Sequence, residues 1–259
     1  MIRAFLACLL LVSAADASER RYATPEEAAA YRAVGLVVSK QGSCTGVLVA
    51  PALVLTAAHC VADAKARSVT PADQLIFHAG WAGRTAVASL RADSVEVHPG
   101  YFATGGRYTE AQARMDVARI VLSAPTPEEA ASPLPLGATP AAGAEVALLS
   151  YPGGRRARLS VQSPCLARAR RTEFLILDCL SEPGASGSPV VRLGPKGAEV
   201  VALISGSRRN AEEARALALG LDHVRDWIGG AAIPQESAPV PGAGRRISRP
   251  GDGLKALKR

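Results

Sequence analysis

Short apolar runs separated by turn-forming residues are the feature that most limits what this chain can fold into. Roughly a dozen runs rich in Val, Leu, Ala and Ile follow one another, with many of the 24 Gly and 18 Pro residues between them. Short strands at such spacing are typical of barrels and sandwiches, whereas βαβ units need longer helical segments between the strands. The sequence therefore predicts an all-β fold, with strands at residues 34–38, 46–49, 53–56, 75–78, 85–97, 117–122, 146–149, 157–161, 174–177, 190–193, 200–204 and 217–221.

One helix is predicted close to the end of these runs. Asp222 is a favourable N-cap for the segment H-V-R-D-W-I, and the pair Gly229-Gly230 ends the helix. The main domain is therefore expected to span residues 34–230. Residues 231–259 are rich in Pro and Gly and are predicted to be a disordered tail.

Much of the net charge of +7 belongs to this tail. Residues 235–259 hold six Lys or Arg residues against Glu236 and Asp252, and they therefore supply +4. The rest of the chain is only mildly basic, so we expect no domain-wide nucleic-acid surface and no requirement for nucleic acid as a partner. The tail is either an arm that binds anionic surfaces or nucleic acid, or a solubilising extension without a further role.

The first 17 residues have the pattern of a secretory signal peptide. Arg3 supplies a positive start, residues 4–15 form an apolar stretch, and A-D-A at residues 15–17 matches a cleavage site. The stretch is too short to span a bilayer, and no later segment is long and apolar enough, so we expect no transmembrane segment. The protein is expected to be secreted or periplasmic, with residues 18–33 as a short pro-segment or a polar surface helix.

Four cysteines remain after the predicted signal peptide: Cys44, Cys60, Cys165 and Cys179. An even number in an exported chain predicts disulfides, and four cysteines allow three pairings. We favour Cys44–Cys60 and Cys165–Cys179, since each would close a loop of about 15 residues and contribute roughly 3 kcal/mol in the chain-entropy model. A metal site is the competing interpretation. Because no C-x-x-C pair or His cluster supports it, we predict no metal.

The segment from Cys44 to Cys60, C-T-G-V-L-V-A-P-A-L-V-L-T-A-A-H-C, carries the strongest chemical signal. It reads as strand, turn, strand, and then a tight helical turn that presents His59. A disulfide between the two ends of the segment would hold that turn rigidly, as the positioning of a general base requires. His59 is therefore the candidate base, although a histidine beside a cysteine can also be purely structural.

The T-A-A-H-C sequence resembles the catalytic-histidine segment of the trypsin–chymotrypsin family of serine peptidases. A second segment, G-A-S-G-S-P at residues 184–189, is similar to the nucleophile loop of that family, and most similar to its bacterial, glutamyl-endopeptidase-like branch. The resemblance implies that Ser186 is the nucleophile. It also implies that the backbone N–H groups of Gly184 and Ser186 form the oxyanion hole.

The third catalytic residue must be a carboxylate that orients the imidazole. In the family it opens a strand of the form D-I-A-L-L-x-L, and the matching segment M-D-V-A-R-I-V-L selects Asp116. Asp93 and Asp63 are the alternatives, and Asp63 is too close to His59 in sequence to reach it from another strand. Arg119 departs from the usual apolar residue, and alternation along the strand would turn its side chain to solvent.

A further segment, A-L-I-S-G-S, resembles the strand that pairs with the substrate backbone, and it makes Ser205, Gly206 and Ser207 the candidate substrate-binding residues. The resemblance also implies that Ser205 supports Asp116. One departure concerns activation, because the family often has an aspartate before the nucleophile that captures a newly cut N-terminus. Here Ala185 occupies that position, so this ion pair is impossible.

The resemblance implies two packed six-stranded antiparallel β-barrels, chymotrypsin-like, with a short C-terminal helix. It also implies a serine endopeptidase that hydrolyses peptide bonds through an acyl-enzyme intermediate and needs no cofactor. Its partners would be protein or peptide substrates, and we expect a monomer. The alternative function is a catalytically silent module that keeps the protease fold for binding.

Overall fold

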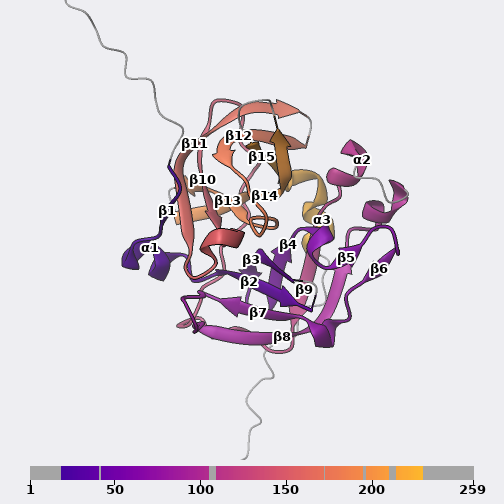
Figure 1. Ribbon diagram of the computed structural model, residues 1–259, viewed down its shortest axis with the longest axis vertical. Helices are drawn as coiled ribbons and strands as arrows, with labels where there is room; N and C mark the ends of the chain where they lie inside the picture. Colours follow the sequence, from indigo (N-terminus) through magenta and orange to yellow (C-terminus); the bar gives the residue numbers. More distant parts are fainter. Residues whose placement is uncertain are drawn as a thin grey trace, which may run out of the picture.

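The structure is a computed structural model that describes residues 19–40, 42–104, 109–171, 173–194, 197–209 and 214–229. The predicted signal peptide, residues 1–17, and the predicted basic tail, residues 231–259, lie outside these ranges. Strands dominate the described chain, and they form two barrels that lie one above the other in Figure 1.

The first barrel is a closed sheet of six antiparallel strands in the order β2-β3-β4-β9-β8-β7. Its strands β4 and β9 are buried along their whole length, because their apolar side chains are covered on both faces of the sheet. The strands of this barrel are β2 (Val34–Ser39), β3 (Gly42–Ala50), β4 (Leu53–Thr56), β7 (Ile76–Ala79), β8 (Ala88–Val97) and β9 (Ala118–Leu122).

The second barrel has the strand order β11-β10-β13-β14-β15-β12 and closes through pairing of β12 with β11. A short additional strand, β1 (Arg21–Tyr22), pairs with the outer edge of β11. The barrel strands are β10 (Glu145–Ser150), β11 (Ser160–Arg171), β12 (Phe174–Leu180), β13 (Pro189–Gly194), β14 (Gly197–Arg209) and β15 (Ala214–Gly220). The predicted all-β fold of two six-stranded antiparallel barrels is confirmed.

The strands observed in the two barrels lie at the predicted runs, but several are longer than predicted. The strand β14 was predicted at residues 200–204 and runs from Gly197 to Arg209, and β11 also extends well beyond its predicted end. Residues 157–161 were the expected strand, whereas β11 runs from Ser160 to Arg171. The second half of this strand has the sequence P-C-L-A-R-A-R-R, in which the proline and the charged residues hide the strand pattern. Pairing with β10 on one side and β12 on the other keeps the segment extended.

Short helices and turns connect the strands. The remaining elements are α1 (Pro25–Ala30), η1 (Ala58–Cys60), β5 (Ala62–Asp63), β6 (Ser68–Val69), η2 (Ala72–Gln74), η3 (Pro99–Thr104), α2 (Glu110–Ala113), η4 (Gly153–Arg155), η5 (Asp222–Val224) and α3 (Arg225–Gly229). In the predicted N-terminal segment, α1 begins with a capping box in which Thr24 and Glu27 bind each other's backbone N–H groups.

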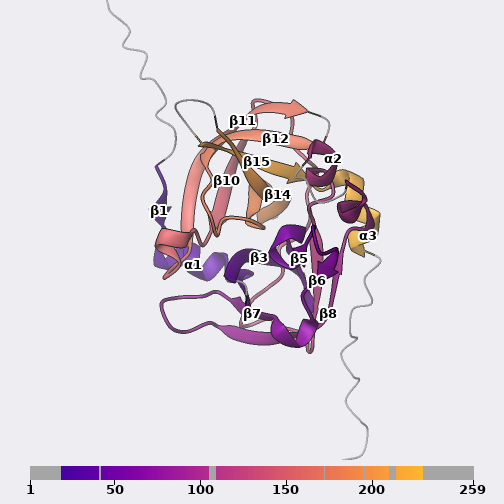
Figure 2. The ribbon, with the colours of Figure 1, turned by 45° about the vertical axis from the view of Figure 1, so that its right-hand side comes forward.

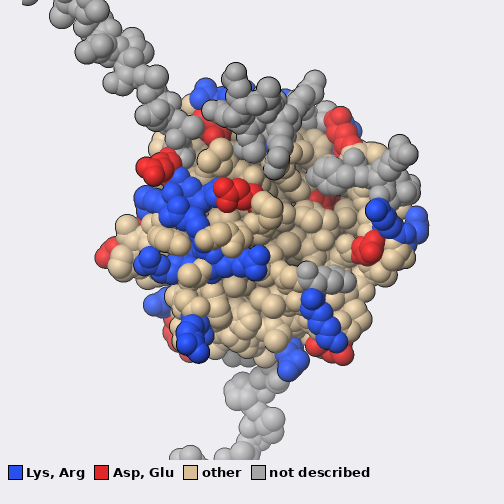
Figure 3. Space-filling view, in the orientation of Figure 1, with Lys and Arg blue, Asp and Glu red and all other residues tan. Residues whose placement is uncertain are grey.

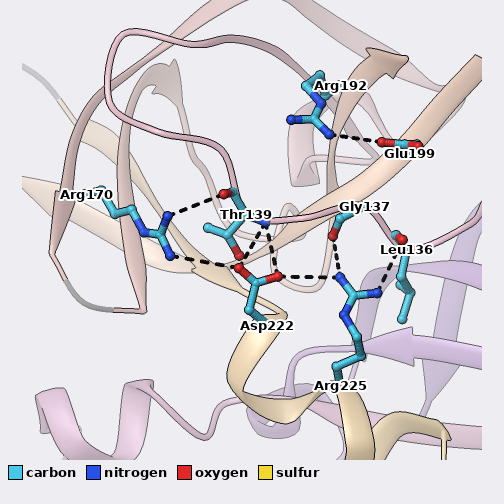
Figure 4. A network of polar contacts seen from close by, with 8 residues as sticks. All are labelled: Leu136, Gly137, Thr139, Arg170, Arg192, Glu199, Asp222 and Arg225. Carbon is cyan, nitrogen blue, oxygen red and sulfur yellow. Dashed lines mark hydrogen bonds and ion pairs between the residues drawn. The ribbon is translucent and has the colours of Figure 1, made fainter. Parts of the chain in front are cut away.

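The C-terminal helix forms as predicted, but Asp222 does not cap it. The turn η5 precedes α3, and both carboxylate oxygens of Asp222 accept the backbone N–H of Thr139 at 3.2 Å (Figure 4). Arg225 donates from the helix to the carbonyls of Leu136 and Gly137 at 3.3 and 2.6 Å. The helix is therefore anchored to the segment that connects the two barrels.

The seam between the barrels is packed with apolar side chains. One buried cluster contains Leu48 and Leu55 of the first barrel together with Leu149 and Leu203 of the second. A separate cluster fills the interior of the second barrel. Figure 2 shows β3 beneath the strands of the second barrel, where this seam lies. Residues at the seam are held by both barrels, which gives fixed positions to side chains contributed by either one.

Candidate active site

His59 lies in the one-turn helix η1 that directly follows β4. Cys60 forms a disulfide with Cys44 of β3, and their Cα atoms are 6.0 Å apart. The backbone N–H of Cys60 also donates to the carbonyl of Ala57 at 3.1 Å. The turn that presents His59 is therefore fastened to the barrel by a covalent bond and by its own hydrogen bonding.

Asp116 lies between α2 and β9, with its side chain fully buried. Oδ2 accepts a hydrogen bond from Nδ1 of His59 at 2.8 Å and another from Oγ of Ser205 at 2.5 Å. Oδ1 accepts the backbone N–H of His59 at 3.0 Å. Three donors thus satisfy a carboxylate that water does not reach, and two of them belong to the histidine that this carboxylate orients.

The surroundings of His59 shift its pKa upward. Burial lowers the pKa of His59, but the charge of Asp116 and the hydrogen bond to it raise the pKa by more, so the net shift is upward. With Nδ1 donating to Asp116, the lone pair of a neutral imidazole is on Nε2. The side chain is 32% exposed, so part of the imidazole ring is open to solvent.

Ser186 lies in the loop between β12 and β13, with glycines in a left-handed backbone conformation on both sides. Gly184 has φ +91° and Gly187 has φ +75°. A Cβ at Gly187 would come within 2.3 Å of the carbonyl oxygen of Thr45. Only glycine allows the loop to approach the first barrel this closely.

The backbone N–H groups of this loop differ in their hydrogen bonding. The N–H of Ala185 donates to the carbonyl of Glu182 at 2.9 Å, and that of Gly187 donates to Ile204 at 2.7 Å. Within the described parts of the chain, the N–H groups of Gly184 and Ser186 donate to no acceptor. A pair of free donors, one of them the N–H of Ser186 itself, can bind an oxygen that develops negative charge beside the serine.

One backbone hydrogen bond brings Ser186 to the side of the first barrel that carries His59. The carbonyl of Ser186 accepts the N–H of Thr45 at 3.0 Å, and Thr45 is next to the disulfide-bonded Cys44. Among the described residues, His59 and Ser186 form no direct hydrogen bond. In unliganded enzymes such bonds are often long and shorten when substrate binds.

The candidate substrate-binding residues Ser205, Gly206 and Ser207 lie on β14 beside this loop. The register between β14 and β15 shifts between Ile204 and Gly206, so Ser205 lies at an irregularity of the sheet. Such irregularities redirect side chains, and here the Ser205 hydroxyl is directed to Asp116. Gly206 is half-buried and Ser207 is exposed, which leaves them as the candidates for contact with substrate.

A hollow of about 420 Å³ lies beside the same disulfide. Ser43, directly before Cys44, is one of its lining residues, and Trp81 and Arg156 are two others. The guanidinium of Arg156 has no acidic partner in the described chain. The hollow can therefore accept a group that combines an apolar part with negative charge.

Arg119 contradicts the expectation that alternation turns it to solvent. The residue is 7% exposed and lies beneath the C-terminal helix, where its guanidinium stacks on the ring of Trp227 at 4.6 Å and donates to the Trp227 carbonyl. It also pairs with Glu96 at 2.7 Å. The correction has a physical reason: the helix covers this face of β9, which strand alternation alone cannot reveal.

The described residues offer no evident place for a metal. No group of three or more His, Cys, Asp or Glu side chains in these ranges is arranged to hold an ion.

The second disulfide, Cys165–Cys179, joins β11 to β12 inside the second barrel, away from His59. In the same described ranges, no helix has the length and hydropathy needed to cross a bilayer.

Comparison with known proteins gives a family and a fold. The family model for a trypsin-like peptidase domain matches residues 44–203, which include His59, Asp116 and Ser186. A solved structure of a Glu endopeptidase in complex with MPD is similar to this chain, with a TM-score of 0.69 and 20% sequence identity. The similarity covers 83% of this chain and 96% of that one. Among curated proteins no match is found.

Proposed function

Since this chain belongs to the trypsin-like peptidase family, we propose that it is an exported serine endopeptidase with Ser186 as nucleophile, His59 as general base and Asp116 as the orienting carboxylate. One observation carries the assignment: a fully buried carboxylate binds both the ring Nδ1 and the backbone N–H of a partly exposed histidine. This arrangement holds the imidazole in one tautomer and stabilises its protonated form.

The catalytic cycle follows from these positions. Oγ of Ser186 attacks the carbonyl carbon of the scissile peptide bond, and Nε2 of His59 takes the hydroxyl proton. The N–H groups of Gly184 and Ser186 bind the resulting oxyanion. His59 then gives its proton to the leaving amine, which leaves an acyl-enzyme on Ser186. A water molecule, deprotonated by His59, releases the acid product and restores the serine.

Substrates are proteins or peptides bound in extended form. The strand β14 supplies Ser205, Gly206 and Ser207 along one side of the substrate, with Gly206 and Ser207 as the contact residues. Because His59 protonates the leaving amine, residues on the C-terminal side of the cleaved bond pass next to the Cys44–Cys60 disulfide. Export through the N-terminal signal peptide is supported by two disulfides, which persist in oxidising compartments outside the cytoplasm.

The test compares Ser186→Ala with a matched serine substitution in the same loop. Ser188 is two residues away, and its buried hydroxyl has no hydrogen-bond partner in the described chain, so Ser188→Ala is the control. We expect the parent and Ser188→Ala to react with a fluorophosphonate probe and to cleave casein. Ser186→Ala should do neither, with a loss of roughly 10⁶-fold in kcat.

Two outcomes would contradict the proposal in different ways. A parent protein that is folded but neither labels nor cleaves indicates the silent binding module instead. Cleavage of casein by Ser186→Ala at the parental rate would instead remove Ser186 from the mechanism.

A further inference from the structure

A buried arginine near the start of the described chain contacts the loop that leads to Ser186. The side chain of Arg20 is only 7% exposed, and arginine is rarely buried without a partner. Its Nη1 lies 2.7 Å from Oε2 of Glu182, and its Nη2 donates to the carbonyl of Leu180 at 2.9 Å. The guanidinium thus joins two chain segments that are 160 residues apart in sequence.

Glu182 belongs to the turn that precedes the nucleophile. Its backbone carbonyl accepts the N–H of Ala185 at 2.9 Å, which closes the turn. The two amides on either side of Ala185 are those of Gly184 and Ser186, the pair left free of acceptors in the described chain. The orientation of both amides therefore depends on where Glu182 is held.

The N-terminal segment is itself firmly attached, so Arg20 is well placed to hold this turn. The strand β1 pairs with β11, and Arg155 donates to the carbonyl of Arg20 at 3.2 Å. The guanidinium groups of Arg155 and Arg158 lie over the ring of Tyr22 at 4.3 and 4.4 Å. Lys and Arg side chains gather on the side of the molecule where Figure 1 shows β1 and α1 (Figure 3).

The end of β12 does not depend on Arg20. Leu180 donates its N–H to Oε1 of Gln162 at 2.9 Å, and its carbonyl accepts from Nε2 of the same glutamine at 2.9 Å. Removing the guanidinium would leave these two bonds in place. The loss would therefore fall on the side chain of Glu182, which has Arg20 as its ion-pair partner.

We propose that Arg20 is a positioning residue that acts through Glu182 to hold the turn carrying the Gly184 and Ser186 amides in its catalytic orientation. The inference rests on the proposed function, because it assigns these amides to the oxyanion hole. Ala185 supplies no carboxylate directly before the nucleophile, and an internal guanidinium that is present once the chain folds takes over the attachment of this loop. It follows that residues 20–33 are retained in the active enzyme rather than removed with a pro-segment.

The experiment measures steady-state kinetics and active-site labelling for Arg20→Ala and Arg20→Lys in the full exported chain. The control is Arg168→Ala, which removes a guanidinium paired with Asp178 at 2.9 Å on the surface of the second barrel. Because oxyanion donors act mainly in the transition state, we expect kcat of Arg20→Ala to fall roughly 10- to 100-fold with KM changed by less than about 2-fold.

Three further readouts separate positioning from mere stabilisation. Labelling by a fluorophosphonate should slow in parallel with kcat, while every active site still reacts in the end. Added methylguanidinium should restore part of the rate of Arg20→Ala, and Arg20→Lys should retain part of it. The melting temperature should stay within about 4 °C of the parent, as we also expect for Arg168→Ala.

Mass spectrometry of the active enzyme should find an N-terminus at or before Arg20.

Glu182→Ala provides the second, independent variant, which also covers the case in which Arg20→Ala does not fold. It should reproduce the loss of kcat, and the double variant should lose no more than either single one, because both changes break one connection. Parental kcat in Arg20→Ala or in Glu182→Ala would overturn the proposal, as would an active enzyme that begins after Arg20. An inactive but folded parent would instead mean that the proposed function is wrong.

Discussion

A methyl group added at Gly187 tests whether the contact between the nucleophile loop and the first barrel controls activity. A Cβ at this position would lie 2.2 Å from Oγ1 of Thr56 and 2.3 Å from the carbonyl oxygen of Thr45. Thr56 is bound to that same carbonyl at 2.8 Å, so neither group can move without disturbing the other. The N–H of Thr45 also donates to the carbonyl of Ser186, and any displacement is passed to the serine.

The expected loss of folding free energy in Gly187→Ala has two parts, one from the backbone conformation and one from packing. Placing alanine at φ +75° costs about 1–2 kcal/mol, because Cβ approaches the following carbonyl in the left-handed region. Forcing a methyl group into a packed site costs a further 1–3 kcal/mol or so. Gly187→Ala should therefore lower the free energy of unfolding by about 2–5 kcal/mol. A shift of the serine of about 1 Å should slow fluorophosphonate labelling roughly 100-fold.

The control variant Gly143→Ala separates the backbone cost from the packing cost. Gly143 has φ +89°, but a Cβ there meets nothing within 4 Å, so only the backbone cost of about 1–2 kcal/mol applies. Urea unfolding would measure the stability of both variants, and labelling would measure the reactivity of Ser186. If Gly187→Ala were no less stable than Gly143→Ala and labelled at the parental rate, the close approach of the two barrels at this loop would be refuted.

The remaining predictions concern His59 and its carboxylate. Asp116→Asn should lower kcat roughly 10⁴-fold with the fold intact, because an amide cannot present acceptors to both N–H groups of His59, and active-site labelling beside a far-UV spectrum would show this. Burial lowers the pKa of His59, but Asp116 raises it by more, so the acidic limb of the kcat/KM profile should have its midpoint above pH 6.5. The same raised pKa gives stability that is fully present below pH 6.5 and is lost as the pH rises through the folded-state value. The parent should therefore lose stability relative to His59→Gln over that window in urea titrations, and a difference that grows with pH would contradict the sign of the shift.

The hydrogen bonding of Asp116 links the two barrels. The carboxylate belongs to the first barrel, whereas Ser205, which donates to it, belongs to the second. A buried carboxylate that lacked this donor would keep an unsatisfied lone pair, at a cost of about 1–3 kcal/mol or more. The hydrogen bond therefore stabilises the contact between the two barrels. It also restrains Asp116, the carboxylate proposed to orient His59.

Apolar runs and turn residues indicated where most strands of the two barrels lie, whereas the segments proposed to carry the site were identified by their resemblance to a known family. Apolar runs predicted strands such as β4, because a four-residue apolar run bounded by turn residues is typical of a buried strand. The cysteine spacing and the segments around His59, Asp116 and Ser186 are short, so their pattern survives without knowledge of the fold. Beyond such segments, local pattern becomes ambiguous, and β11 was predicted too short because Pro164 and the arginines that follow it imitate a loop.

Partners that are distant in the sequence were decided only by the tertiary structure. Arg20 reaches Leu180 across 160 residues, and nothing in the sequence indicated this contact. The contact of Ser205 with Asp116 across 89 residues was expected only through the resemblance to a known family. The sequence predicted Arg119 to be exposed, but α3 covers it in the structure. It predicted Asp222 to be a helix cap, but the carboxylate of Asp222 accepts the backbone N–H of Thr139 instead. The sequence determines which side chains are apolar, charged or reactive. Closure and packing of the two barrels determine which of them meet, because contact follows from strand order and register across the whole domain.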